Sequence, residues 1–168
     1  HAEAVRWYRL AAEQGETSAY FNLGRMFLNG FGVSQDDAEA VRWFKLAAEL
    51  ASIEDGKAEA QHNLGYMYSV GQGVPRDYAE AVRWYSLAAE HGLDGAQYNL
   101  GRMYGIGRGV PRDIVIAYMW FNLAAYQGHY NATELRDTLE KTMTSHEISR
   151  AQQLSSECLA RNYRGCGR

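Results

Sequence analysis

A tryptophan recurs along the chain at a nearly constant interval. Successive copies lie 36, 41 and 36 residues apart, at Trp7, Trp43, Trp84 and Trp120. Two strings keep the same interval: Asn-Leu-Gly, which begins at Asn22, Asn63 and Asn99, and Gly-x-Gly-Val, which begins at Gly30, Gly71 and Gly107. A period in this range is typical of stacked two-helix units, each of which buries its apolar face against the next. The repeat therefore predicts an all-α chain.

Each unit reads as a first helix, a glycine loop and a second helix. The first helix follows the pattern AxxNLGxMYxxG. Its central glycine (Gly24, Gly65, Gly101) costs a helix about 1 kcal/mol relative to alanine, which indicates a close helix crossing without room for a side chain. The loop glycines permit positive φ at a helix end. An N-cap aspartate then precedes each second helix, at Asp36, Asp77 and Asp113, and Glu39 and Glu80 stand where a capping box places a glutamate.

The second helix carries the tryptophan and has two different sides. Its aromatic and alanine residues are predicted to fill the space between stacked helices. A cofactor-binding aromatic box is the alternative, but repetition at a fixed period favours packing. The other side is a polar stripe, seen in Glu39, Arg42, Lys45 and Glu49, with Glu-to-Arg pairs at i,i+3.

These features together resemble the Sel-one-like repeats, relatives of the tetratricopeptide repeats. The motif AxxNLGxMYxxGxGVPRDxAEAVRWYxLAAExG carries the resemblance over residues 1–130. It implies a right-handed α-solenoid, an α/α superhelix of two-helix repeats, whose concave surface is lined by the first helices. It also implies a scaffold or adaptor for protein complexes, in bacterial envelope, secretion or host-interaction systems, with no shared catalytic residues.

We expect one solenoid domain over residues 1–168. Its expected parts are the second helix of a truncated repeat (1–15), three repeats (16–51, 56–92 and 93–128), a diverged first helix (129–143), and a capping helix with a tail (144–168). Because the chain starts inside a helix pattern without an initiator methionine, we expect a fragment, and any signal peptide would lie outside it.

The last second helix departs from the pattern. Ile116, Met119 and Tyr126 stand where the preceding copy has Glu80, Arg83 and Glu90. A stripe that has become apolar must be covered. We expect residues 145–162 to cover it as a terminal cap, beginning at the capping box of Thr144 and Glu147. A partner or dimer surface is the alternative.

Two cysteines, Cys158 and Cys166, lie near the C-terminal end. Their even number and the turn-forming Gly165 between them favour a disulfide, which would suit a periplasmic or secreted protein. Two free thiols in a reducing compartment are the alternative.

Several functions find no support. A net charge of −3 with interleaved signs offers no field for nucleic acid, and no apolar run approaches a membrane span. The five histidines show no metal-ligand spacing, so we expect neither a metal nor a cofactor. A hydrolase acting on cell-wall or β-lactam substrates is an alternative taken from relatives, but Ser-x-x-Lys and Lys-Thr-Gly are both missing. A pure spacer within a longer array is the third possibility.

We expect a non-enzymatic, monomeric scaffold that binds a protein or peptide on the first helices. The residues expected on that face are Asn22, Arg25, Asn29, Asn63, Tyr66, Asn99 and Arg102. The asparagines would form a ladder of amides for the backbone of an extended peptide, although a purely structural role is as well supported. The variable residues Arg25, Tyr66 and Arg102 are the better candidates for specificity.

Overall fold

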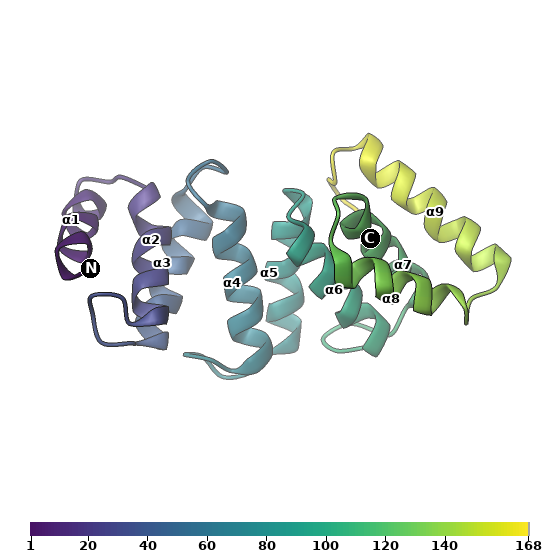
Figure 1. Ribbon diagram of the computed structural model, residues 1–168, viewed down its shortest axis with the longest axis horizontal. Coiled ribbons are helices and arrows are strands. Elements are labelled where there is room, and N and C mark those ends of the chain that lie inside the picture. Colours follow the sequence, from purple (N-terminus) through teal and green to yellow (C-terminus); the bar gives the residue numbers. More distant parts are fainter. Residues whose placement is uncertain (168) are drawn as a thin grey trace. The chain divides into compact units, whose positions relative to one another are not determined.

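The computed structural model describes residues 1–167, and every regular element within them is an α-helix (Figure 1). The helices are α1 (Ala2–Glu13), α2 (Ser18–Asn29), α3 (Asp37–Leu50), α4 (Lys57–Val70), α5 (Tyr78–Glu90), α6 (Asp94–Ile106), α7 (Ile114–Tyr126), α8 (Tyr130–Glu140) and α9 (Ser145–Ala160). The expected all-α solenoid is confirmed. None of the described helices combines the length and apolarity needed to cross a bilayer.

The chain divides into two compact units, and the boundary falls within α5. The first unit is His1–Ala81, with α1 to α4 and the start of α5. The second unit starts at Val82 and holds the rest of α5 with α6 to α9. Each unit has its own buried residues and is described separately below.

The core of the first unit forms where α3 packs against both α2 and α4. Leu23, Phe44 and Leu64 come from these three helices, and each is fully buried. At the crossing of α2 and α3, a Cβ added to Gly24 would lie 2.6 Å from the Phe44 ring. The close crossing expected at the central glycine is therefore confirmed.

The first helix of each repeat ends at a glycine in the left-handed conformation. Gly30, Gly71 and Gly107 adopt the left-handed conformation there, with φ of 68°, 78° and 78°. Their N–H groups donate to the carbonyl four residues back, at Met26, Met67 and Met103. Glycine is needed at these positions because other residues reach this conformation only with strain.

The N-cap aspartates are confirmed. Asp36 accepts a hydrogen bond from the Glu39 N–H at 2.9 Å, and Asp77 accepts one from the Glu80 N–H at 3.0 Å. The capping box expected at Glu39 is wrong. The Glu39 carboxylate pairs instead with Arg42, at 2.8 Å from Nη1. The Asp36 N–H, which a capping box would pair with the Glu39 carboxylate, already donates to the Phe27 carbonyl at 3.0 Å.

The insertion between the first two repeats is held by an aspartate. The Thr17 hydroxyl donates to Asp55 Oδ2 at 2.7 Å, and the Asp55 N–H donates to Ser52 Oγ. The hydrogen bonds from Thr17 and then Ser52 lower the pKa of Asp55 below its ordinary value. The carboxylate form thus ties the inserted turn to the start of α2.

The second unit is organised around α7, whose side chains are buried on most sides. Met119, Trp120 and Phe121 are each no more than 3% exposed. Three helices, α6, α8 and α9, pack on α7. Leu135 of α8 lies in the cluster around Phe121, and Ile148 of α9 lies in the cluster around Tyr118. The helix α9 packs on α7, and its capping box of Thr144 and Glu147 is formed. That it serves as the cap over Ile116, Met119 and Tyr126 stays a prediction.

The residues after α9 fold back within the second unit. A disulfide joins Cys158 to Cys166, with a Cα–Cα distance of 5.4 Å. The Tyr163 ring packs against Gly92, where an added Cβ would lie 3.1 Å from it. The Tyr104 hydroxyl donates to the Gly167 carbonyl at 3.4 Å. The disulfide thus closes a short loop that lies on residues near α5 and on α6.

The repeated tryptophans do not share one environment. Trp84 and Trp120 are 6% and 1% exposed, as expected of residues that fill the stack. Trp7 is 61% exposed, and in the described chain α2 is the main helix neighbour of α1. The packing role expected for Trp7 stays a prediction.

Candidate functional site

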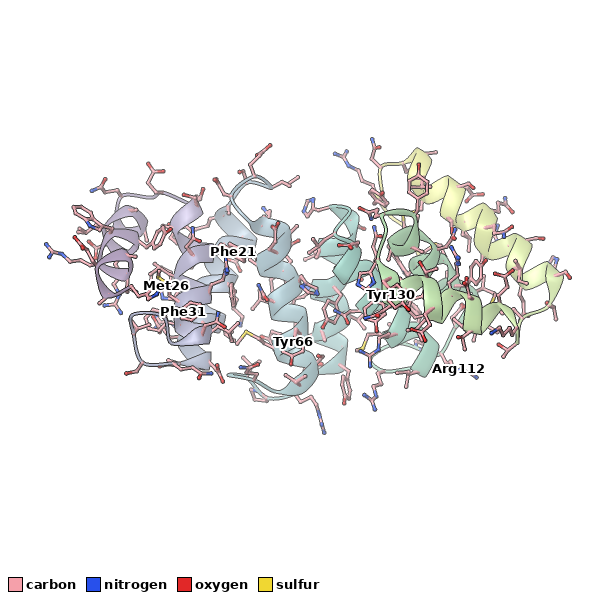
Figure 2. All side chains as sticks on the ribbon, viewed as in Figure 1. Phe21, Met26, Phe31, Tyr66, Arg112 and Tyr130 are labelled. Carbon is pink, nitrogen blue, oxygen red and sulfur yellow. A yellow bond between two sulfur atoms is a disulfide. The ribbon has the colours of Figure 1, made fainter. Side chains whose placement is uncertain are left out.

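One position of the first helix faces solvent in every repeat. It is occupied by Arg25 in α2, Tyr66 in α4 and Arg102 in α6, and all three are exposed. Tyr66 is 50% exposed and projects from α4 (Figure 2). This position varies between arginine and tyrosine, as expected of a residue not needed for stacking.

The two arginines at this position are held in the same way. The Arg25 guanidinium lies 5.8 Å from the Phe21 ring centroid, and the Arg102 guanidinium lies 5.8 Å from that of Tyr98. In each case the aromatic residue precedes the arginine by one turn. Within residues 1–167 neither arginine forms an ion pair. Both cations are therefore positioned yet available to an anion.

The asparagines of the first helices are partly used by their own helix. The Asn22 amide donates to the Ser18 carbonyl at 3.0 Å, and the Asn29 amide donates to the Arg25 carbonyl at 2.8 Å. Asn63 and Asn99 are half-buried. The amide N–H groups of Asn22 and Asn29 thus satisfy local carbonyls, while their oxygens stay on the helix surface. A ladder of amides for a bound peptide stays a prediction.

The three residues of the apolar stripe differ in their surroundings. Met119 is buried at 1% exposure, and Ile116 is half-buried. Tyr126 is 76% exposed, so its side chain is left uncovered within the described chain. The exposed aromatic at the next helix start, Tyr130, is 79% exposed (Figure 2).

A pocket that sequence reasoning missed lies in the second unit, where α6, α7 and α8 meet. Its volume is about 380 Å³. Phe121, Leu135, Leu139 and Ile106 form most of its apolar wall, and Arg102 also lines it. Gly105 of α6 has no side chain, and it therefore leaves the space that a larger residue would fill.

The repeat explains why the pocket opens here. The residue equivalent to Gly105 is Leu28 in the first repeat and Ser69 in the second, at the same 36- and 41-residue intervals. Leu135 likewise stands where the earlier first helices carry Asn63 and Asn99. Gly105 removes a side chain from the wall, and Leu135 puts an apolar side chain where the earlier helices carry an amide. Aligning the repeats with α8 would have revealed both exchanges from sequence.

The shifted pKa values lie outside this pocket. Burial raises the pKa of Tyr104, and the charge of Asp113 adds to the effect. Burial also raises the pKa of Tyr118, whose hydroxyl donates to Glu140 at 3.0 Å. Residues 1–167 contain no group of three histidine, cysteine, aspartate or glutamate side chains placed to hold a metal ion. The shifted groups therefore belong to helix packing.

Comparison with protein-family models matches the model described as Sel1 repeat at residues 1–16, 17–52, 58–93 and 95–129. The chain belongs to the Sel1 repeat family. Its matched segments follow the tryptophan period and hold the glycine loops, caps and exposed positions described above. Sel1 repeat proteins are generally protein-interaction scaffolds, and the family is typically non-catalytic.

Solved structures of other Sel1 repeat proteins are similar to this one. A Sel1 repeat protein from Oxalobacter formigenes is 42% identical, with a TM-score of 0.68, and the match covers 78% of this chain and 95% of that chain. The protein c5321, a protective antigen present in uropathogenic Escherichia coli strains, displays an SLR fold. It is 29% identical with a TM-score of 0.62, and the match covers 95% of this chain and 41% of that chain. Among curated protein sequences no match is found.

Proposed function

We propose that this chain is a non-enzymatic scaffold that binds a peptide or protein partner on the exposed side of its first helices. The observation that carries the proposal is the exposed position at Arg25, Tyr66 and Arg102. Many recurring residues of the motif are accounted for by a cap, a turn or a helix crossing, and this position is not one of them. It varies between arginine and tyrosine, and aromatic and arginine side chains dominate protein interfaces.

Each unit has its own set of these residues. In the first unit Arg25 and Tyr66 are joined by Asn22, Asn29 and Asn63, whose amide oxygens suit the N–H groups of an extended peptide. In the second unit Asn99 and Arg102 occupy the corresponding positions. We infer that specificity comes from the arginines and the tyrosine, because an amide recognises any backbone.

The setting we propose is the bacterial envelope, a secretion system or a host-interaction system, with the chain in the periplasm or secreted. Bacterial proteins with this fold are often periplasmic or secreted. The disulfide between Cys158 and Cys166 supports this, because such bonds persist in oxidising compartments. We further propose that the chain is a monomer, which light scattering coupled to size exclusion tests.

Partner capture tests the proposal directly. The immobilised chain is compared with the variant that combines Arg25→Glu, Tyr66→Ala and Arg102→Glu. The matched control is Arg42→Glu, which reverses an exposed charge on the polar stripe of α3. We expect the triple variant to lose the captured partner and the control to retain it, with both keeping the helical circular dichroism. Equal capture by the triple variant and the unmodified chain would contradict the proposal.

A further inference from the structure

We propose that the pocket between α6 and α8 receives a large apolar side chain of the partner, and that carboxylates flank that side chain in the partner's sequence. This inference rests on the scaffold function and names the chemistry of the partner. The pocket belongs entirely to the second unit, and Gly105 is the residue that opens it.

The walls of the pocket suit an apolar occupant. Phe121 forms its deep part and is 3% exposed, while Leu135 and Leu139 supply the α8 side. Ile106 is 54% exposed at the rim, so this apolar surface stays in water until something covers it. A volume of about 380 Å³ is within the range of small-molecule and side-chain pockets. Burial of a large apolar side chain there removes water from both surfaces.

The hydroxyl groups of the pocket are already used by α8. The Thr138 hydroxyl donates to the Glu134 carbonyl at 2.8 Å, and the Thr142 hydroxyl donates to the Leu139 carbonyl at 2.8 Å. These residues therefore turn their hydroxyl hydrogens back onto their own helix. We therefore expect polar recognition at the rim to come from Arg102 and Arg112, the two arginines that line the pocket.

The charge of the rim is positive and unopposed. Arg102 and Arg112 both line the pocket, and no acidic residue does. Arg112 belongs to the loop between α6 and α7 (Figure 2), and its Nε donates to the Gly105 carbonyl at 3.0 Å. Arg102 is supported by the Tyr98 ring. Within the described residues neither guanidinium is paired with a carboxylate. Two held cations beside an apolar cavity complement a carboxylate beside an apolar side chain.

A direct binding measurement tests the chemistry. The probe is the peptide Gly-Glu-Glu-Phe-Glu-Glu-Gly with a fluorophore at its amino end, titrated with the full chain and followed by anisotropy. One comparison peptide has lysine in place of each glutamate, and another has alanine in place of the phenylalanine. We expect each exchange to weaken binding by about tenfold or more, and binding of the acidic peptide to fall as salt is added.

Two variants place the binding in the pocket. Gly105→Leu fills the cavity with the side chain that the first repeat carries at Leu28, so the helix has a precedent for it. Arg102→Glu reverses the rim charge without touching the core. We expect each to weaken the probe by about tenfold or more. The matched control is Arg42→Glu, which reverses an exposed charge on the polar stripe of α3, outside the proposed binding residues, and we expect less than a twofold effect.

The inference is overturned if the lysine peptide binds as tightly as the acidic one, or if Gly105→Leu and Arg42→Glu affect the probe equally. Circular dichroism of each variant shows whether it has folded. Partner capture separates this inference from the scaffold function. A partner that is lost with the triple variant but retained by Gly105→Leu would support the scaffold and contradict the pocket.

Discussion

The helices α3 and α7 are copies of one motif, but α3 keeps one side exposed to solvent, whereas α7 is covered by other helices on most sides. On α3 the polar stripe is intact, and the Arg42 side chain is 77% exposed while it pairs with Glu39. On α7 the position equivalent to Arg42 is Met119, which is 1% exposed. The difference shows how the stack is sealed: an apolar stripe lets α8 and α9 close around the helix.

Exchanging these two residues should give the largest effect. In Met119→Arg a charge without a partner is forced into the core of the second unit, and we expect the free energy of unfolding to fall by about 3–5 kcal/mol. The reverse exchange in the first unit, Arg42→Met, removes only a surface ion pair and should change stability by less than about 1 kcal/mol. Urea unfolding followed by circular dichroism measures both. Similar losses from the two exchanges would contradict the comparison.

The disulfide belongs to the second unit and has no counterpart in the first. Its bridge spans a sequence separation of 8 residues. Replacing both cysteines with serine should lower the free energy of unfolding by about 2–3 kcal/mol, because a closed loop of this length restricts the unfolded chain. Urea unfolding of the variant and the unmodified chain, with and without dithiothreitol, measures this. A reductant effect on the serine variant would mean that something other than the bridge is responsible.

Two glycines of α6 should respond in opposite directions. An added Cβ on Gly101 would lie 2.8 Å from the Phe121 ring, whereas on Gly105 it would meet Ala117 Cβ at 3.7 Å. We expect Gly101→Ala to lower the free energy of unfolding by about 1–3 kcal/mol through overpacking. We expect Gly105→Ala to raise it by up to about 1 kcal/mol, since alanine is the better helix former. The same measurement on Gly24→Ala extends the comparison to the first unit, where a loss is again expected.

The smallest expected effect is a dependence of stability on pH. One carboxylate in each unit is responsible, Asp55 in the first and Glu147 in the second. Hydrogen bonds from the Thr144 N–H and hydroxyl lower the pKa of Glu147, as those from Thr17 and Ser52 lower that of Asp55. Because each folded-state pKa lies below its unfolded value, the stabilisation is present above the unfolded pKa and is lost as the pH falls through the folded pKa.

Thr17→Val and Thr144→Ala test this in the two units. Each should be more destabilising at neutral pH than once the carboxylate is protonated. Thr144→Ala also removes the N-cap hydrogen bond from the Glu147 N–H, and that part of the loss should not vary with pH. Thermal unfolding across the acid range measures the difference. A destabilisation that does not vary with pH would assign the threonine a role in packing instead.

Much of the fold was predictable because its signals are local. The N-cap at Asp36, the left-handed Gly30 and the close crossing at Gly24 each depend on one residue type at one place in the repeat, and all three are confirmed. The error at Glu39 arose because the Asp36 N–H, which a capping box needs, donates to the Phe27 carbonyl of the preceding helix, and the Glu39 carboxylate pairs with Arg42.

The candidate site was less predictable, because part of it depends on how several helices pack together. The exposed position of Arg25, Tyr66 and Arg102 follows from helix periodicity and was found from sequence. The pocket depends on Gly105, Phe121 and Leu135, which come from three helices. Each looks like an ordinary helix residue when its own segment is considered alone.

The sequence by itself determined the repeating unit, because caps, turns and helix crossings act between residues that are close in the chain or one period apart. It also determined that the stack must be closed after α7, since the stripe at Met119 is apolar. Only the tertiary structure decided how far α9 covers that stripe, leaving Tyr126 in water, and where the missing side chain of Gly105 opens a cavity. Covered area and empty volume are properties of several helices packed together, so no single segment contains them.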